Sequence, residues 1–173
     1  MLTRISRSSR RRASASPGTD GAVAMPSFHT VKRVPHSPAQ MFDLVADVEK
    51  YPQFVPLCES LRVRRRSQSD DGIEILVADM SVGYKSIRET FTTRVTLDRA
   101  RLRIDVEYID GPFRFLENRW KFLEEGENGC DVDFHIAYEF RNFALGMLMG
   151  AMFDRAFRKF TTAFETRARE VYG

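Results

Sequence analysis

The C-terminal part of the chain, residues 143–172, contains no proline, and its apolar residues recur at helical spacing. The recurring positions are Leu145, Met149, Met152, Phe153, Ala156, Phe157, Phe160, Phe164, Ala168 and Val171. Charged and polar residues occupy much of the remaining face, so the pattern predicts an amphipathic helix. A helix of roughly thirty residues is about 45 Å long. Only a large apolar surface, such as one face of a whole β-sheet, covers a helix of that length.

The preceding part of the chain predicts such a sheet. Between residues 57 and 140, apolar and polar residues alternate with a period of two, as in strands that bury one face. The predicted strands are 57–67, 73–83, 86–97, 102–109, 115–124 and 130–140. The links between them are short and rich in turn-forming residues, which favours antiparallel pairing of consecutive strands. The sequence therefore predicts an α+β fold with a curved antiparallel sheet of six to seven strands.

Another strand and a short helix precede this sheet. Ser27–Val34 alternates like a strand, and Ser37 before Pro38 is a favourable helix start, which predicts a helix over 39–47. Residues 51–58 are hydrophobic, yet Pro52 and Pro56 exclude a regular helix there. An apolar segment of this kind packs over a core or forms the lip of a pocket.

The basic character of the chain is concentrated at its beginning. The formal net charge is +3, but residues 1–25 hold five arginines and one acidic residue, so residues 26–173 are close to neutral. We therefore expect one folded domain over 26–173 and no DNA partner. Three interpretations fit the Arg/Ser-rich extension 1–25: a disordered basic arm, a mitochondrial-type presequence, or translation that begins at Met25. We favour the last two over the first, and the third over the second.

The sequence nominates no catalytic residue and no metal ligand. His29, His36 and His135 are scattered, and the two cysteines, Cys58 and Cys130, are far apart and predicted to be reduced core residues. The usual nucleophile, zinc-protease and phosphate-binding motifs do not occur. We therefore expect a non-enzymatic protein without a catalytic cofactor.

Two features favour a cavity under the C-terminal helix, although an amphipathic helix over a solid core is the more common arrangement. The first half of the helix combines flexible methionines with Gly146 and Gly150, an unlikely composition for a rigid lid. Polar residues also interrupt the apolar strand faces, namely Glu89, Thr93 and Asn118. The apolar stretch 143–153 additionally suits peripheral contact with a membrane surface as an interfacial helix.

Several segments resemble a known family. Residues 47–58 read Asp-Val-Glu-Lys-Tyr-Pro-Gln-Phe-Val-Pro-Leu-Cys, residues 111–113 Gly-Pro-Phe, residues 120–122 Trp-Lys-Phe, and residues 163–168 Ala-Phe-Glu-Thr-Arg-Ala. Together with the order of elements, they resemble the coenzyme-Q-binding START-like family of the polyketide cyclase/START-like superfamily. The resemblance covers residues 26–173. It implies the helix-grip fold, with two short helices after the first strand.

The resemblance implies two alternative functions. One is binding of ubiquinone or a similar isoprenoid lipid, in support of respiratory electron transport. The other is that of RatA-type toxins, which bind the large ribosomal subunit and block subunit association. The near-neutral charge of residues 26–173 favours the first, in the bacterial cytoplasm and peripherally at the inner membrane, or alternatively on the matrix side of the mitochondrial inner membrane. A basic stripe could still bind phosphate unless neighbouring acids balance it: Arg62, Arg64, Arg65, Arg66, Arg88, Arg94, Arg101 and Arg103.

The predicted ligand site has three parts. The lip consists of Tyr51, Phe54, Val55, Pro56 and Leu57. The sheet wall consists of Phe91, Val106, Leu116, Trp120, Phe134 and Ile136, and the helix wall of Leu145, Met149, Met152, Phe153 and Phe160. Glu89 or Asn118 is the candidate hydrogen-bond partner of a quinone ring oxygen.

Overall fold

The computed structural model describes residues 26–173, so the three interpretations of residues 1–25 lie outside the described part. Seven strands form one antiparallel sheet with the order β1-β7-β6-β5-β4-β3-β2. The strands are β1 (Ser27–Val34), β2 (Cys58–Gln68), β3 (Glu74–Tyr84), β4 (Ile87–Asp98), β5 (Arg103–Asp110), β6 (Phe113–Glu125) and β7 (Gly129–Phe140). Consecutive strands from β2 to β7 are neighbours, which confirms the predicted meander. The first strand joins its far edge by pairing with β7.

Two short helices connect β1 to β2. Helix α1 (Pro38–Ala46) begins with a capping box in which the Ser37 hydroxyl accepts from the Gln40 N–H at 3.1 Å and the Gln40 side chain accepts from the Ser37 N–H at 2.9 Å. The 3₁₀ helix η1 (Val48–Gln53) follows and contains Pro52. The chain is then irregular up to β2, as the two prolines predict.

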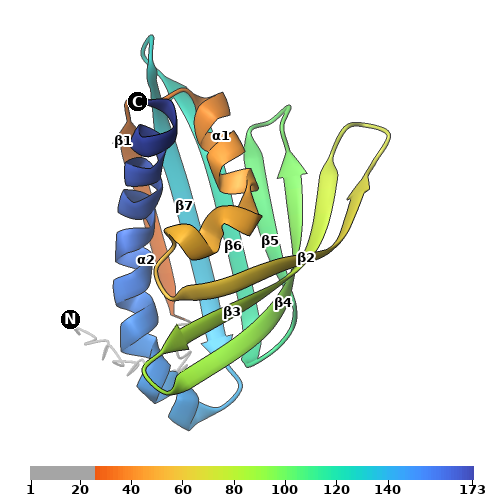
Figure 1. The fold of residues 1–173 in the computed structure, drawn as a ribbon, viewed down its shortest axis with the longest axis vertical. Coiled ribbons are helices and arrows are strands. Elements are labelled where there is room, and N and C mark those ends of the chain that lie inside the picture. The colour runs from red at the N-terminus through yellow and green to blue at the C-terminus, as the bar shows by residue number, and fades with distance from the viewer. Residues whose placement is uncertain (1–25) are drawn as a thin grey trace, which may run out of the picture.

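Helix α2 (Phe143–Tyr172) has the bounds predicted from the apolar pattern. Asn142 caps it by accepting from the Leu145 N–H at 3.1 Å. Figure 1 shows α2 lying lengthwise along β1 and β7, with α1 beside its C-terminal half and the β2–β4 end of the sheet curling round toward η1. The helix therefore covers one end of the sheet closely, and the curled end stands away from it.

Candidate functional site

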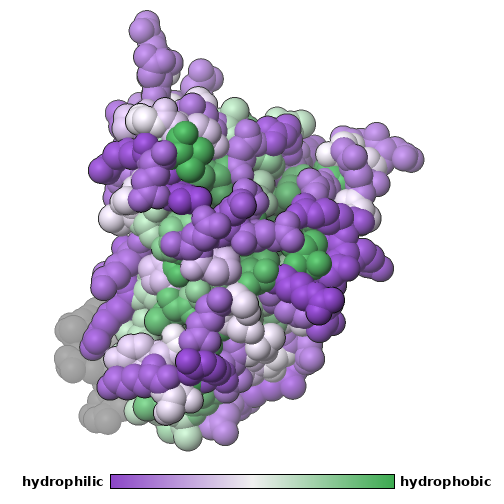
Figure 2. Space-filling view, in the orientation of Figure 1, coloured by the Kyte–Doolittle hydropathy of each residue, from purple (hydrophilic) through white to green (hydrophobic). Residues whose placement is uncertain are grey.

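The space between the sheet and α2 is not completely filled by side chains. A cavity with a free volume of about 100 Å³, partly open to solvent, lies between the inner face of the sheet, the segment joining η1 to β2, and the middle of α2. The space-filling view shows apolar surface in the gap between α2 and strands β2 and β3 (Figure 2). The lining residues are Val48, Tyr51, Val55, Pro56, Leu57, Leu61, Ala78, Met80, Val82, Phe91, Thr93, Val95, Ile104, Val106, Leu116, Asn118, Trp120, Phe134, Ile136, Phe153, Ala156, Phe157, Phe160 and Phe164.

The structure brings thirteen of the eighteen predicted site residues to this cavity. They are Tyr51, Val55, Pro56, Leu57, Phe91, Val106, Leu116, Asn118, Trp120, Phe134, Ile136, Phe153 and Phe160. The lip segment and the sheet wall are thus placed as the alternation suggested. Contact of these residues with a ligand stays a prediction.

The first ten residues of α2, which include three residues of the predicted helix wall, do not line the cavity. The cavity begins at Phe153 along the helix, so Leu145, Met149 and Met152 lie beyond its end. Met149 is buried in the hydrophobic core instead, and a Cβ built on Gly146 would contact Phe140 at 3.6 Å. These methionines therefore do not form an adjustable cavity wall.

Phe54 and Glu89 also lie outside the cavity. The Phe54 ring packs against Phe164, with ring centroids 5.0 Å apart, and the Arg167 guanidinium lies 5.4 Å from the Phe54 ring centroid. Glu89 lies opposite Val82 and shares the inner face of the sheet, as predicted by parity. It lies near the start of β4 and is partly exposed, so its carboxylate does not need a buried partner.

The cavity contains few polar groups, and most of them are already bonded. The Asn118 Nδ2 donates to the His135 carbonyl at 2.9 Å, and its Oδ1 accepts from the Trp120 Nε1 at 2.9 Å. An amide NH₂ carries two hydrogens, so one donor of Asn118 is left over. The Tyr51 hydroxyl donates to the Val45 carbonyl at 2.5 Å, and burial raises the pKa of Tyr51, so the phenol stays neutral.

Thr93 is the second polar group that the sequence placed on the inner face. It is buried in β4 opposite Ala78 and Tyr108, and it lines the cavity. Asn118 lies on β6, with β5 between the two strands. The sheet wall thus carries two hydrogen-bonding side chains in an otherwise apolar lining.

The Gly111-Pro112-Phe113 segment holds the far end of the cavity together. Gly111 has φ +137, and a Cβ on it would lie 2.7 Å from the Phe91 Cβ, so any larger residue collides with the cavity wall. This close approach allows the Phe113 ring to meet Phe91 edge-on at 5.4 Å and to stack on Phe140 at 4.7 Å. The motif therefore fixes the aromatic wall.

Eleven of the lining residues were not part of the predicted ligand site, although one of them, Thr93, was expected on the inner face. Those on α2 were available from the pattern, because Ala156, Phe157 and Phe164 follow Phe153 and Phe160 at helical spacing. On the sheet, Ala78, Met80 and Val82 share one face of β3. The contrast between the two faces of β3 is weak, because Asp79, Ser81 and Gly83 alternate with small or flexible residues. The inward residues of β3 were therefore not predicted to line the cavity.

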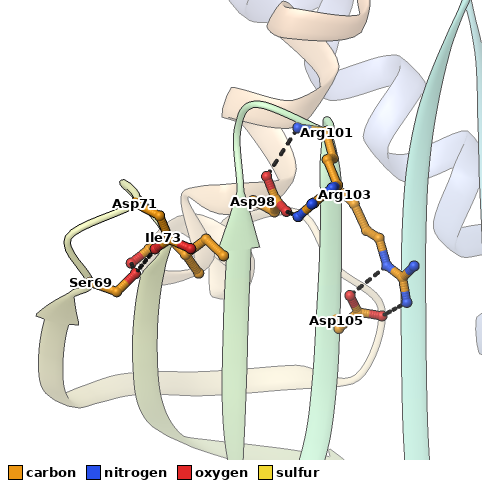
Figure 3. Close-up of polar contacts among 7 residues, drawn as sticks. All are labelled: Ser69, Asp71, Ile73, Asp98, Arg101, Arg103 and Asp105. Carbon is orange, nitrogen blue, oxygen red and sulfur yellow. Dashed lines mark hydrogen bonds and ion pairs between the residues drawn. The ribbon is translucent and has the colours of Figure 1, made fainter.

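The predicted basic stripe on the outer face is largely neutralised. Arg64 pairs with Asp79 at 2.5 Å, and Arg103 grips Asp105 with two bonds of 2.6 and 2.9 Å. Figure 3 shows the Arg103–Asp105 pair beside the Asp98–Arg101 turn. Arg66 and Arg88 are also paired, with Glu49, Glu74 and Glu59. Five of the eight arginines are therefore balanced by acids, which leaves a weaker electrostatic footprint for RNA than the sequence suggested.

Asp98 joins β4 to β5 and makes the turn sensitive to acid. Its carboxylate accepts from the Arg101 backbone N–H at 3.0 Å and from Arg101 Nη1 at 2.9 Å, and these bonds lower the pKa of Asp98. A carboxyl whose pKa is lower in the folded state stabilises the fold above its unfolded pKa and loses this effect as pH falls through its folded pKa. We expect Asp98→Asn to cost about 1 kcal/mol near neutral pH. Urea unfolding at neutral and strongly acidic pH tests this: the cost should shrink in acid, and an unchanged cost would contradict it.

The remaining reactive groups offer little chemistry. Cys58 and Cys130 are both free and buried, as predicted, and burial raises the pKa of each thiol to about 11. Among residues 26–173 there is no group of three histidines, cysteines or acids that could hold a metal ion. In the same range no helix is long and apolar enough to cross a membrane.

Two known proteins are similar to this chain in sequence over most of its length. The chain is 34% identical over 150 residues to the ribosome association toxin RatA of Escherichia coli K12, covering 87% of this chain and 91% of that protein. It is 28% identical over 138 residues to the mitochondrial coenzyme Q-binding protein COQ10 homolog B of Xenopus laevis, covering 78% of this chain and 54% of that protein.

A solved structure and a family profile agree with the fold. The solution structure of an 18 kDa protein of Caulobacter crescentus is 36% identical, has a TM-score of 0.71, and covers 86% of this chain and 99% of its own. The profile of the family described as polyketide cyclase/dehydrase and lipid transport matches residues 34–165. The seven-stranded sheet gripping a long C-terminal helix is the helix-grip arrangement implied by the sequence resemblance. This chain therefore belongs to the polyketide cyclase/dehydrase and lipid transport family, with a START-like fold.

Proposed function

We propose that this protein binds an isoprenoid quinone, ubiquinone in the first place, in the cavity between sheet and helix and thereby supports respiratory electron transport at the inner membrane. The cavity carries the proposal. It is partly open to solvent and is lined mainly by hydrophobic and aromatic side chains with few polar groups, as small-molecule sites usually are. Its apolar lining suits an isoprenoid tail, and the name of the Xenopus relative supports a quinone.

Binding without catalysis is favoured by the composition of the wall. Among the described residues that line the cavity there is no histidine, aspartate, glutamate, lysine or arginine. General acid–base catalysis needs a titratable side chain within hydrogen-bond reach of the substrate. A cyclase-like reaction would have to use the Tyr51 phenol, which is kept neutral and already donates to a backbone carbonyl.

Asn118 and Thr93 are the groups we expect to recognise the ring. A para-quinone presents two carbonyl oxygens, which only accept hydrogen bonds, and the spare Asn118 amide hydrogen and the Thr93 hydroxyl are both donors. Thr93→Val keeps the shape of the side chain and removes the donor. We expect about 1 kcal/mol, or about fivefold, weaker binding of a short-chain ubiquinone.

The natural probe is Trp120, the single tryptophan of the chain, because it lies on the cavity wall and a bound quinone should quench its fluorescence. The matched control is Thr96→Val, three residues along β4 and partly exposed on the outer face opposite Asp105. If the Thr93→Val and Thr96→Val variants bind the short-chain ubiquinone with equal affinity, Thr93 does not hydrogen-bond the ligand.

The proposal as a whole is tested by organic extraction of the purified protein followed by mass spectrometry. We expect near-stoichiometric ubiquinone or a close isoprenoid relative. Repeated recovery of empty protein, together with failure of added quinone to quench Trp120, would refute quinone binding.

Ribosome association is the second candidate, favoured by the 34% identity with RatA over most of this chain. It predicts co-sedimentation with isolated large ribosomal subunits and a reduced yield of joined ribosomes. The paired arginines of the outer face weigh against a broad RNA-binding surface there. Sedimentation of the full chain with large subunits tests ribosome association. Together with the extraction experiment, it shows whether the protein has both functions or only one.

A further inference from the structure

The first turns of α2 present apolar side chains to solvent. Residues 143–152 contain no charged or hydrogen-bonding side chain, and only Met149 among them is buried. Phe143 is 82% exposed, Met147 70% and Leu148 60%. A helical segment that is apolar on all sides is normally covered, and clustered exposed apolar residues mark an interaction surface. These three residues, with their small neighbours Ala144 and Ala151, form what we call the apolar tip.

The charges beside the apolar tip have one predominant sign. Arg141 precedes the helix, and Arg155, Arg158 and Lys159 are exposed on the turns that follow. Asp154 is the single acidic residue between positions 141 and 160, and it pairs with Arg158 at 3.1 Å. The segment thus carries excess positive charge, although the domain as a whole is close to neutral. This contrasts with the outer face of the sheet, where acids balance most arginines.

An apolar tip followed by exposed cations complements an anionic lipid surface. Apolar side chains at such a surface enter the boundary between headgroups and acyl chains, and adjacent lysines and arginines are attracted to anionic headgroups. Lysine is depleted at protein–protein interfaces, which disfavours a protein partner or a second copy on a surface that includes the exposed Lys159. We propose that the apolar tip inserts into the surface of an anionic bilayer, with Arg155 and Lys159 at the headgroups.

The apolar tip lies next to the cavity along α2, which suggests how membrane docking would serve ligand binding. Phe153 follows the tip on the same helix and is the first α2 residue on the cavity wall. Docking through the tip therefore brings one end of the cavity wall to the membrane, where a quinone resides. This use rests on the proposed quinone binding, whereas docking itself does not require a ligand.

Vesicle flotation of the full chain tests the docking. We expect the protein to float with vesicles of phosphatidylcholine mixed with phosphatidylglycerol, to float poorly with phosphatidylcholine alone, and to be released by high salt. The double variant Met147→Glu/Leu148→Glu should reduce partitioning about tenfold or more, because it places two charges in the apolar contact. Arg155→Gln/Lys159→Gln should reduce partitioning to anionic vesicles and remove most of its salt dependence.

Val171→Glu is the matched control, since Val171 is an exposed apolar residue at the opposite end of α2. It should float like the unaltered chain. Quenching of Trp120 by quinone in the absence of lipid reports folding and cavity binding separately, so failure of docking and failure of ligand binding give different results. Docking through the tip is overturned if the unaltered chain ignores anionic vesicles or if the Met147/Leu148 variant floats normally. It is equally overturned if sedimentation shows that this variant dissociates a dimer built on the tip.

Discussion

Replacing Ala156 with phenylalanine is expected to weaken quinone binding strongly and leave the fold intact. Ala156 is 5% exposed and lines the cavity between Phe153 and Phe160 on α2. A phenylalanine ring at this position extends into the space that the ligand tail would occupy. Because the ring fills an existing cavity, overpacking strain should be small, and stability should change by no more than about 1 kcal/mol. The dissociation constant of a short-chain ubiquinone should rise about tenfold or more.

Quenching of Trp120 measures this binding directly, and urea unfolding measures the stability. The matched control is Thr166→Phe, which adds the same ring to an exposed position of the same helix. Unchanged affinity in the Ala156→Phe variant would mean that the ligand does not enter the cavity. The same variant separates the two candidate functions, because ribosome association through the outside of the domain should not respond to a filled cavity.

The order and type of the elements could be predicted from the sequence because each is encoded locally. The strand-like alternation of apolar and polar residues is interrupted at turn residues. The apolar helical pattern runs without proline from Phe143 to Tyr172, where α2 is found. The pairing of β1 with β7 is different. It joins segments about a hundred residues apart, and no local pattern encodes it. This pairing was not predicted and is a finding of the structure.

The cavity could be predicted only in part, since periodicity identifies a face but not where a curved sheet ends beneath it. Leu145 and Met152 lie on the side of α2 that the pattern favoured and pack against the hydrophobic core, yet they do not line the cavity. Glu89 has the inward parity and is still partly exposed, because it lies near the start of its strand. Small residues such as Ala78 and Ala156 were overlooked, although small side chains are what leaves room for a ligand.

Surface charge shows the same limit. The arginines of the predicted stripe can be read from the sequence, but the acidic residues that pair with them depend on the register of the strands. Arg64 meets Asp79 only because β2 pairs with β3 through two irregularities, one of them between Val63 and Arg65. Bulges of this kind shift a strand by one residue and are rarely evident from alternation. The ionic neutrality of the outer face is therefore a structural finding.

Phe164→Ala is expected to be the most destabilising of these substitutions. Phe164 is 1% exposed, and its ring meets Tyr51 at 5.3 Å, Phe54 at 5.0 Å and Trp120 at 5.0 Å, all three nearly edge-on. Truncating a buried phenylalanine costs about 3–5 kcal/mol, part of it from the cavity left behind. Urea unfolding should show this loss, whereas Val171→Ala at an exposed position of α2 should change stability by less than about 0.5 kcal/mol.

The same substitution tests what holds the lip over the cavity. Tyr51 and Phe54 belong to the segment between α1 and β2, and Phe164 is their shared aromatic contact on α2. Its loss should free this segment and expose Trp120, so tryptophan emission should shift to longer wavelength before global unfolding begins. A small cost without such a shift would mean that the lip is held from elsewhere, chiefly by the Tyr51 hydrogen bond to the Val45 carbonyl. Tyr51→Phe would then become the destabilising change, because it leaves the ring in place and removes that bond.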